Sequence, residues 1–226
     1  MAYTREELLA RGPQPVLRGR NLDEVAFPLG GIGTGSISLG GWGQLRDWEV
    51  RNRPAKGFQP PHCFFAIKVQ EGNKPAITRV LQGPAGGGRA GNGHTAPNTN
   101  GEGLPHFREV SFHGEYPFAT VTLKDPATPV QVTLEAANPF IPLNEKDSGI
   151  PVAILRYRVT NTGRRTAKVS LFGNLANFIG EREGRVNQAR SRRGLTGLFC
   201  THGKLEEDSP QFGSLALVTP WPDASA

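Results

Sequence analysis

Two acidic side chains separated by one residue lie in the segment RDWEVRNRP, residues 46–54. On a β-strand, alternate side chains point to the same face, so Asp47 and Glu49 would project together and Trp48 from the opposite face. Paired carboxylates beside an aromatic ring are typical of glycoside hydrolysis, one acting as acid and the other as base or nucleophile. A pair on one strand, however, points in parallel instead of flanking a sugar, and the neighbouring arginines favour ion pairs. We therefore expect a structural or interface role for this segment rather than catalysis.

Glycines recur at every second position from Gly31 to Gly35. A dinucleotide-binding loop needs a helix directly after its glycines and an acidic residue about 20 positions later. The residues that follow, Ser36 to Leu39, do not resemble a helix start, and no Gly-Lys-Ser/Thr triplet of a P-loop is present. We expect these glycines to serve tight turns or close backbone packing.

Histidine and cysteine are adjacent at His62 and Cys63, and they occur again at Cys200 and His202. Zinc sites usually separate their paired ligands by two to four residues, a spacing that the adjacent His62 and Cys63 lack. A nucleophilic serine is not expected either, because the chain has no Gly-x-Ser-x-Gly elbow. The sequence predicts no metal and no cofactor.

The net charge of the chain is +6 with histidine neutral, which raises nucleic acids and acidic surfaces as partner classes. Residues 181–193 carry five arginines and two glutamates but no aromatic residue. Proteins that bind single-stranded nucleic acid combine positive charge with aromatic platforms for the bases. We expect residues 181–193 to be a solvated loop, and we expect no nucleic-acid partner.

Apolar runs in the chain are short, as in residues 152–155, and none approaches the length that spans a bilayer. The N-terminal sequence MAYTREELLARG lacks the apolar core of a signal peptide. Cys63 and Cys200 are therefore expected to be reduced thiols. Together these features predict a cytoplasmic protein without a transmembrane segment.

Short alternating segments predict β-strands through most of the chain. In residues 119–124, apolar side chains alternate with threonine and lysine, as in a strand with one buried face. The expected strands are 64–69, 110–112, 119–124, 130–136, 152–160, 167–172 and 215–218. Turns rich in glycine, proline and asparagine separate them, so we predict an all-β protein built as an antiparallel β-sandwich.

Two segments fall outside this pattern. Residues 3–11 contain good helix formers with few apolar positions, which predicts at most a short surface helix. Residues 83–103 are rich in glycine and poor in apolar residues, so we expect a long exposed loop there. Neither segment predicts a second domain.

Three sequence blocks carry a resemblance to a known family. They are FPLGGIGTGSISLGGWGQLRDWEVRNRP at 27–54, LEAANPFIPLNEKDSGIPVAILRYRVTN at 134–161 and KVSLFGNLANFIG at 168–180. They resemble the N-terminal domain of glycoside hydrolase family 116, which includes the non-lysosomal glucosylceramidase, also called bile acid β-glucosidase. In that family an N-terminal, supersandwich-like β-sandwich precedes a C-terminal (α/α)₆ barrel. The resemblance implies an N-terminal arm at 1–26 and a sandwich domain at 27–226.

The resemblance also implies where catalysis takes place. In the family, the barrel carries the Glu nucleophile and the Asp acid/base of a retaining β-glucosidase, so no catalytic residue is expected in this chain. The chain would then be a fragment, a split gene product or a truncated form, with its sandwich incomplete at the C-terminus. It would pack against a catalytic barrel in cis or on a separate chain, and β-glucosides, glucosylceramide among them, would bind only through that barrel.

The residues expected at the interface with the barrel, or lining its cleft, form one charged and aromatic group. They are Arg46, Asp47, Trp48, Arg51 and Arg53. Two other functions stay open at this point. A stand-alone carbohydrate-binding or protein-interaction sandwich would need exposed aromatic platforms, and the chain has only three Trp and three Tyr. Nucleic-acid binding through residues 181–193 would show an affinity that falls steeply with salt.

Overall fold

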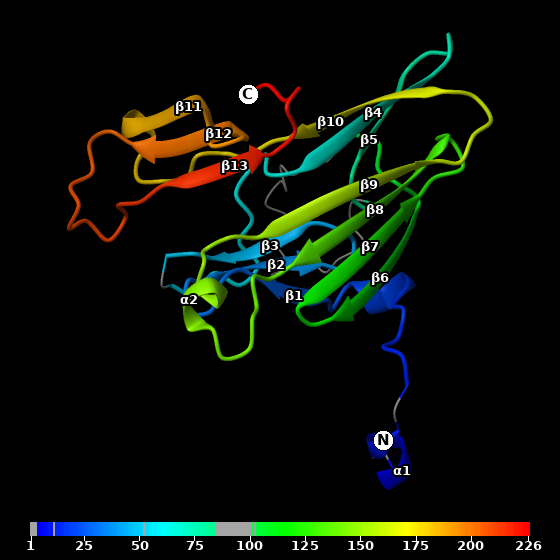
Figure 1. Ribbon diagram of the computed structural model, residues 1–226, viewed down its shortest axis with the longest axis horizontal. Coiled ribbons are helices and arrows are strands. Elements are labelled where there is room, and N and C mark those ends of the chain that lie inside the picture. Colours follow the sequence, from blue (N-terminus) through cyan, green and yellow to red (C-terminus); the bar gives the residue numbers. More distant parts are fainter. Residues whose placement is uncertain (1–3, 11, 52, 85–100, 102) are drawn as a thin grey trace.

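The computed structural model describes residues 4–10, 12–51, 53–84, 101 and 103–226, and most of its regular secondary structure is antiparallel β-sheet (Figure 1). The strands are β1 (Ala26–Leu29), β2 (Ser36–Gly40), β3 (Leu45–Glu49), β4 (Phe65–Glu71), β5 (Ile77–Val80), β6 (Glu109–Glu115), β7 (Phe118–Lys124), β8 (Val130–Ala137), β9 (Ile154–Asn161), β10 (Ala167–Gly173), β11 (Arg185–Arg192), β12 (Leu195–His202) and β13 (Leu215–Thr219). The helical elements are α1 (Arg5–Leu9), α2 (Glu145–Ser148) and the 3₁₀ turns η1 (Gly19–Leu22) and η2 (Arg182–Gly184). The all-β prediction is confirmed, and the loop predicted at 83–103 lies mostly outside the described residues.

The strands form four sheets in the described part of the chain. Their strand orders are β1-β2-β3, β10-β4-β5, β11-β12-β13 and β6-β7-β8-β9. The last of these is a meander whose register places Phe112, Val121, Leu134 and Tyr157 in one row across the four strands. All four side chains point to the same face of the sheet, because residues paired directly across strands share a face.

The hydrophobic core lies under that face. Val121, Leu123 and Val132 of the β6–β9 sheet have no exposed surface, and they belong to the same buried cluster as residues of β1, β2 and β4. The members contributed by these other strands are Leu29, Leu39, Ile67 and Val69. Two layers of strands therefore enclose one core, which is the sandwich that the alternating pattern predicted.

The opposite face of the β6–β9 sheet is polar and open to solvent. Arg156 and Arg158 of β9 are exposed and pair with Glu135 of β8, with N–O distances of 3.4 and 2.8 Å. Tyr157, which lies between them in sequence, is on the inner face and its ring is 5.2 Å from that of Phe65. Alternation along the sequence thus predicted the two faces of this sheet correctly.

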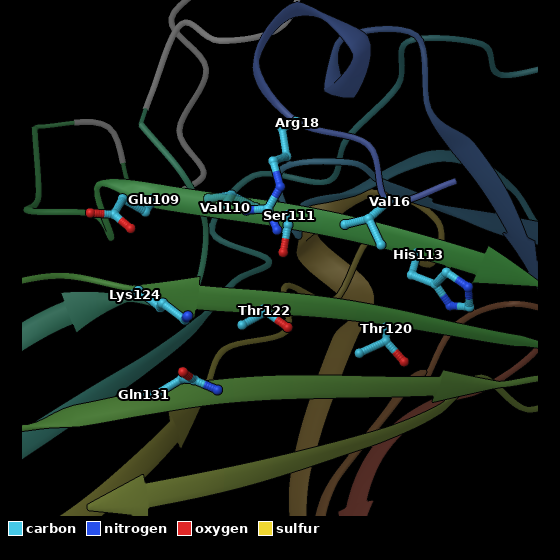
Figure 2. Close-up of a pocket in the computed structure, with 10 residues that line it drawn as sticks. All are labelled: Val16, Arg18, Glu109, Val110, Ser111, His113, Thr120, Thr122, Lys124 and Gln131. Carbon is cyan, nitrogen blue, oxygen red and sulfur yellow. The ribbon is translucent and has the colours of Figure 1, made fainter. Parts of the chain in front are cut away.

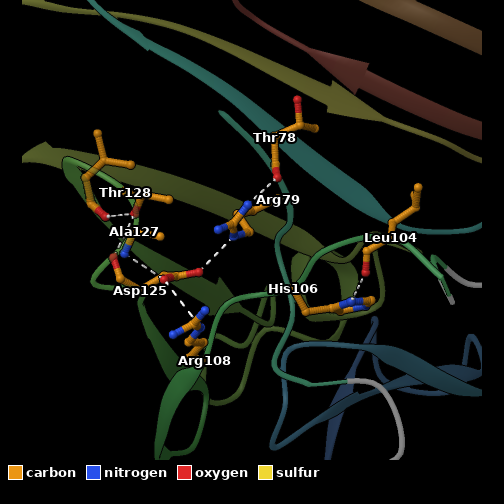
Figure 3. A network of polar contacts seen from close by, with 9 residues as sticks. Thr78, Arg79, Leu104, His106, Arg108, Asp125, Ala127 and Thr128 are labelled. Atoms are coloured by element: carbon orange, nitrogen blue, oxygen red, sulfur yellow. Dashed lines mark hydrogen bonds and ion pairs between the residues drawn. The ribbon is translucent and has the colours of Figure 1, made fainter. Parts of the chain in front are cut away.

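A buried carboxylate connects this sheet to β5 (Figure 3). Asp125, in the turn between β7 and β8, accepts a hydrogen bond from Arg79 Nε at 2.7 Å and lies 3.9 Å from Arg108 Nε. The same side chain accepts the Ala127 backbone N–H at 2.8 Å, and its main-chain carbonyl accepts from Thr128 Oγ1 at 3.1 Å. Asp125 therefore both shapes its own turn and links two sheets.

The N-terminal arm joins the edge of the β6–β9 sheet. Leu17 and Phe112 exchange two backbone hydrogen bonds of 2.8 and 3.0 Å, which places the arm beside β6. Further along the arm, Leu22 is buried in the core, and the Trp42 indole donates to Asp23 Oδ1 at 2.8 Å. The arm is thus an integral part of the fold from Leu17 onwards.

The structure corrects the sequence-based prediction for residues 181–193. These residues were expected to form a solvated loop, but they form η2 and strand β11, which pairs along its full length with β12. Most side chains of β11 are exposed, so the strand shows no alternation between apolar and polar residues. The backbone ladder to β12 holds the strand, together with cross-strand contacts such as that of the Arg190 guanidinium over the Phe199 ring, 3.9 Å from its centroid. No helix in the described residues is long and apolar enough to cross a membrane.

Candidate functional site

The acidic pair of residues 46–54 lies at an irregularity between β2 and β3. The register shifts from Ser38 opposite Arg46 to Ser36 opposite Glu49, so β3 carries one extra residue. Asp47 lies at this bulge with a φ of +50°, a left-handed conformation that side chains such as aspartate tolerate better than most. The bulge breaks the alternation expected of a regular strand, and Asp47 and Trp48 are both buried.

Both carboxylates bind the backbone of the turn that follows. Asp47 Oδ1 accepts the Gly57 N–H at 2.6 Å, and Glu49 accepts the Ala55 N–H at 3.1 Å and the Lys56 ammonium at 2.9 Å. The hydrogen bond from Lys56 holds the pKa of Glu49 below its usual value. These bonds leave neither carboxylate facing an open site, and they account for the pair as a support for residues 55–57.

An aromatic cluster lies beside this turn. Trp48 packs edge-on against Phe178 with ring centroids 5.7 Å apart, and Phe58 packs against the same ring at 6.3 Å. The guanidinium of Arg51 lies over Phe178, 5.1 Å from the ring centroid, and donates a hydrogen bond to the Phe178 carbonyl. Trp48 is buried and Arg51 is exposed, so the tryptophan supports a surface on which the arginine is displayed.

A second arginine binds the same segment. Arg185 Nη2 donates to the Gly180 carbonyl at 2.8 Å, and its Nε lies 3.3 Å from the Ile179 carbonyl. Partial burial, followed by the positive charges of Arg185 and Arg53, lowers the pKa of Arg51. Among the described residues, none of these three arginines forms an ion pair with a carboxylate.

The structure thus divides the five residues that the sequence singled out. Arg46, Asp47 and Trp48 lie mostly inside the fold, where Arg46 Nε is 3.2 Å from Asp47 Oδ2, whereas Arg51 and Arg53 are exposed. Sequence reasoning missed Phe178 and Arg185, which complete the cluster. Phe178 is at least 120 positions from Trp48, Arg51 and Phe58, which it contacts, and a single sequence carries no signal for such pairings.

The glycine-rich loop 30–35 lies next to this cluster, and its contacts explain why glycine is needed there. A Cβ on Gly35 would lie 2.5 Å from the Glu49 carbonyl oxygen. A Cβ on Gly31 would lie 2.7 Å from the Gly149 carbonyl carbon and closer still to the Ile150 carbonyl oxygen. The loop is therefore packed between two backbone segments. This is the close backbone packing that we predicted for these glycines from the sequence.

The segment 138–150 on the other side of this loop presents apolar side chains to solvent. Leu143 is fully exposed and has a φ of +64°, which is unfavourable for a leucine. The buried Ser148 hydroxyl holds the loop by exchanging hydrogen bonds of 2.9 and 3.0 Å with the backbone of Ile141, and Asn144 caps α2. The exposed apolar residues nearby are Ile32, Phe140, Ile141 and Ile150.

These parts lie at one end of the molecule, where β3 ends and α2 begins (Figure 1). We call this region the docking end: loop 30–35, residues 47–51 and 53–58, segment 138–150 and residues 178–185. It combines exposed arginines, aromatic rings and aliphatic side chains on a backbone held by hydrogen bonds from side chains. That composition is typical of the centre of a protein–protein interface.

A second feature is a shallow hollow of about 390 Å³ on the outer face of the β6–β9 sheet (Figure 2). The hydroxyl side chains of Ser111, Thr120 and Thr122 lie on the adjacent strands β6 and β7, with Arg18 and Lys124 at its sides. Among the described residues, no tryptophan, tyrosine or phenylalanine lines it. Its described lining offers hydrogen-bonding groups, and the imidazole of His113 is the one ring among them.

The cysteines are unsuited to nucleophilic or metal chemistry. Burial raises the pKa of the Cys63 thiol to about 11, and burial also raises the pKa of Cys200. The thiolate, which is the reactive and metal-binding form, is therefore disfavoured at both positions. In the part of the chain that the structure describes, no three His, Cys, Asp or Glu side chains are placed to hold a metal ion.

A comparison with protein-family models matches residues 26–225. The matching model is described as beta-glucosidase 2, glycosyl-hydrolase family 116 N-term. The match begins at the first residue of β1 and extends past β13, so it includes the whole docking end. It confirms the resemblance carried by the blocks at 27–54, 134–161 and 168–180.

Proposed function

The chain belongs to the N-terminal-domain family of glycosyl hydrolase family 116, and on that basis we propose that it is the accessory β-sandwich of a β-glucosidase. In this proposal the sandwich supports a catalytic (α/α)₆ domain, joined in cis or carried on a separate chain. The nucleophile and the acid/base belong to that domain, which hydrolyses β-glucosides, glucosylceramide among them. The enzyme works in the cytoplasm, where the buried thiols of Cys63 and Cys200 stay reduced.

The docking end is the observation that carries this proposal. Asp47 and Glu49, the paired carboxylates that the sequence offered for glycoside chemistry, are used to hold a turn. The same turn and its neighbours present Arg51, Phe58 and Leu143 to solvent. This surface is held by side chains beneath it and exposes apolar groups to solvent. Such a surface fits a permanent protein partner better than it fits a small substrate.

The five residues expected from the sequence take two roles in this proposal. Arg51 and Arg53 contact the catalytic domain, because both are exposed at the docking end. Arg46, Asp47 and Trp48 position them from inside through the bulge, the 55–57 turn and the Phe178 ring. The first group should affect association between the domains, and the second group should affect the stability of the sandwich.

Leu143 provides a test because its two expected effects have opposite signs. The replacement Leu143→Asn relieves a left-handed leucine, so the isolated chain should gain about 1 kcal/mol of stability against urea. The same replacement removes an exposed apolar contact, so the affinity for the catalytic domain should fall about tenfold, as for a side chain central to an interface. Urea unfolding and calorimetric titration of the chain with the catalytic domain measure the two quantities.

Leu8→Asn is the matched control. Leu8 lies in α1 and is also exposed, but it is outside the docking end. It should leave both the affinity and the hydrolysis of an aryl β-glucoside unchanged. Equal affinities for the wild-type and Leu143→Asn chains would contradict the proposal.

A second candidate function rests on the hollow of Figure 2. Its hydroxyl, amide and charged side chains match the hydrogen-bonding groups of a glycan, and this supports a stand-alone carbohydrate-binding sandwich without catalysis. Titration of the isolated chain with β-linked gluco-oligosaccharides tests it. Binding that Thr122→Val abolishes, without any affinity for a catalytic domain, would favour this alternative.

A further inference from the structure

Arg51 and Arg185 approach each other because they bind consecutive residues of one segment. Arg51 donates to the carbonyl of Phe178, and Arg185 donates to the carbonyls of Ile179 and Gly180. Arg51 lies two residues after the end of β3, and Arg185 is the first residue of β11, so the two side chains come from strands of different sheets. Their proximity is therefore built into the fold and does not depend on flexible side chains meeting by chance.

No carboxylate of the described residues neutralises this pair. Glu49, the nearest acid in sequence to Arg51, is bound to Lys56 and to the Ala55 N–H. Glu181 and Glu183 flank the segment but form no ion pair with any described arginine or lysine. Partial burial and the charges of Arg185 and Arg53 lower the pKa of Arg51, as expected for a cation held near other cations. Such an arrangement costs free energy until an anion binds to it.

The two guanidiniums keep hydrogen-bonding capacity for such an anion. Each guanidinium has five N–H donors, of which Arg51 uses one and Arg185 uses two in the hydrogen bonds described above. The planar fork of donors matches the two oxygens of a carboxylate. The carbonyl bonds fix the orientation of both side chains beforehand, which reduces the entropy lost on binding.

The surroundings of the pair indicate which kind of anion it binds. Phe178 lies under Arg51, and Phe58, 43% exposed, packs against the same ring. Arginine beside aromatic rings is typical of protein–protein contacts. Lys56 in the same turn is already neutralised by Glu49, so the free positive charge beside these rings comes from arginine, whose planar fork suits a protein carboxylate.

We propose that Arg51 and Arg185 form a receptor for one aspartate or glutamate side chain of the catalytic domain, with Arg53 adding charge beside it. This inference rests on the proposed function and adds the chemistry of the contact. The carboxylate supplies the neutralising charge that the sandwich itself lacks at this place. The apolar contact at Leu143 and the charged contact at Arg51 are then two separate parts of one interface.

Amide hydrogen exchange in the complete enzyme, the chain together with its catalytic domain, tests the receptor. The charge reversal Arg51→Glu with Arg185→Glu should reduce at least tenfold the slowing of exchange that the catalytic domain causes in residues 176–186, taken as the ratio of exchange rates in the isolated chain and in the complete enzyme. The variant Arg51→Lys with Arg185→Lys keeps the positive charges but loses the planar guanidinium donors, so its effect on exchange should be smaller than that of the charge reversal. The control Arg164→Glu with Arg165→Glu makes the same charge change in the β9–β10 turn, at the opposite end of the molecule (Figure 1), and should have no effect.

Exchange in β7 and β8 shows in each variant that the sandwich is folded. Arg51→Glu with Arg185→Glu could leave the effect of the catalytic domain on exchange of residues 176–186 unchanged while Leu143→Asp speeds exchange of segment 138–150. In that case the proposed carboxylate receptor is wrong, but the docking end is still the contact with the catalytic domain. If neither variant changes exchange, both proposals fail. Binding of the wild-type chain to phosphatidylserine vesicles that the charge reversal abolishes would also overturn the receptor, because the anion would then be a lipid phosphate.

Discussion

Gly31 and Gly35 show how single residues shape the docking end. The alternating glycines invite a comparison with phosphate-binding loops, but the space around each α-carbon gives the actual reason for them. At Gly31 the backbone of residues 149–150 occupies the position of a side chain, and at Gly35 the Glu49 carbonyl does so. The two residues bring three separate stretches of backbone into contact, which no residue with a Cβ would allow.

The replacement Gly31→Ala tests whether this close backbone packing is the reason for the glycine. The added methyl group would overlap the Ile150 carbonyl, and forcing the two segments apart should cost roughly 1–3 kcal/mol of unfolding free energy. Gly33→Ala in the same loop is the control, since Gly33 has a φ of +75° but no atom lies within 4 Å of the place that a Cβ would take. It should lose only the conformational term of about 1 kcal/mol. Urea unfolding of the two variants gives the comparison, and equal losses would show that packing is not the reason for Gly31.

At the scale of elements, Asp125 connects the turn between β7 and β8 to β5. Burial alone would raise the pKa of Asp125, but hydrogen bonds from Arg79 and Ala127 and the charge of Arg108 together lower it below the usual value. A lowered folded-state pKa means that the ionised form stabilises the fold. This contribution is present above the unfolded pKa of about 3.9 and is lost as the pH falls through the folded-state value.

The replacement Asp125→Asn should therefore change both the size of the stability and its pH dependence. Removing one partner from a buried ion pair costs about 3 kcal/mol near neutral pH, because Arg79 is left without its counter-charge. Below about pH 4 the difference from the wild type should begin to shrink, because the carboxylate of the unfolded chain takes up a proton there before that of the folded chain does. Glu135→Gln, on the exposed pair with Arg156 and Arg158, should cost less than about 1 kcal/mol. Urea unfolding at pH 7 and pH 3 measures these effects, and a pH-independent difference would refute the assignment.

The elements differ in how well the sequence predicts them. Strands β7, β8 and β9 have one buried and one solvated face, so their alternation shows directly in the sequence. Strands β2 and β11 were missed for opposite reasons: β2 lies in a glycine-rich stretch that suggests turns, and β11 has exposed side chains on both faces. The alternation of apolar and polar residues reveals a strand that is buried on one face only. It gives no signal for a strand whose two faces lie in the same environment.

The docking end was predicted only in part. Its residues within 46–53 stand out because charge and aromatic character are concentrated there, and the glycines next to them indicated close packing. Phe178, Arg185 and Leu143 give no comparable signal, since their role depends on contacts between distant segments or on a left-handed backbone. Local sequence therefore located one part of the surface, and tertiary structure defined the rest.

At the scale of the whole molecule, the sandwich has one core and several open strand edges. An uncovered edge can pair with another chain, and proteins usually protect such edges. On β6 the protection comes from the N-terminal arm, through the two backbone bonds between Leu17 and Phe112. Buried Leu22 and the Trp42–Asp23 hydrogen bond anchor the arm in place.

Deleting the arm should therefore promote self-association. A chain without residues 1–23 exposes the β6 edge and part of the core, and it should form larger species as its concentration rises. A chain without residues 1–12 loses α1 but keeps Leu17, so it should sediment like the full chain. Sedimentation velocity compares the three, and identical behaviour of the longer deletion and the full chain would show that the arm is dispensable.

The position of the arm in the chain has a consequence during synthesis. The ribosome makes the N-terminus first, so Leu17 has left the exit tunnel well before β6 is complete. A covering segment encoded after β13 would leave the β6 edge uncovered until that later segment had been synthesised. Here the cover is available as soon as its edge exists, which shortens the time in which a nascent chain on a crowded polysome can pair with its neighbour.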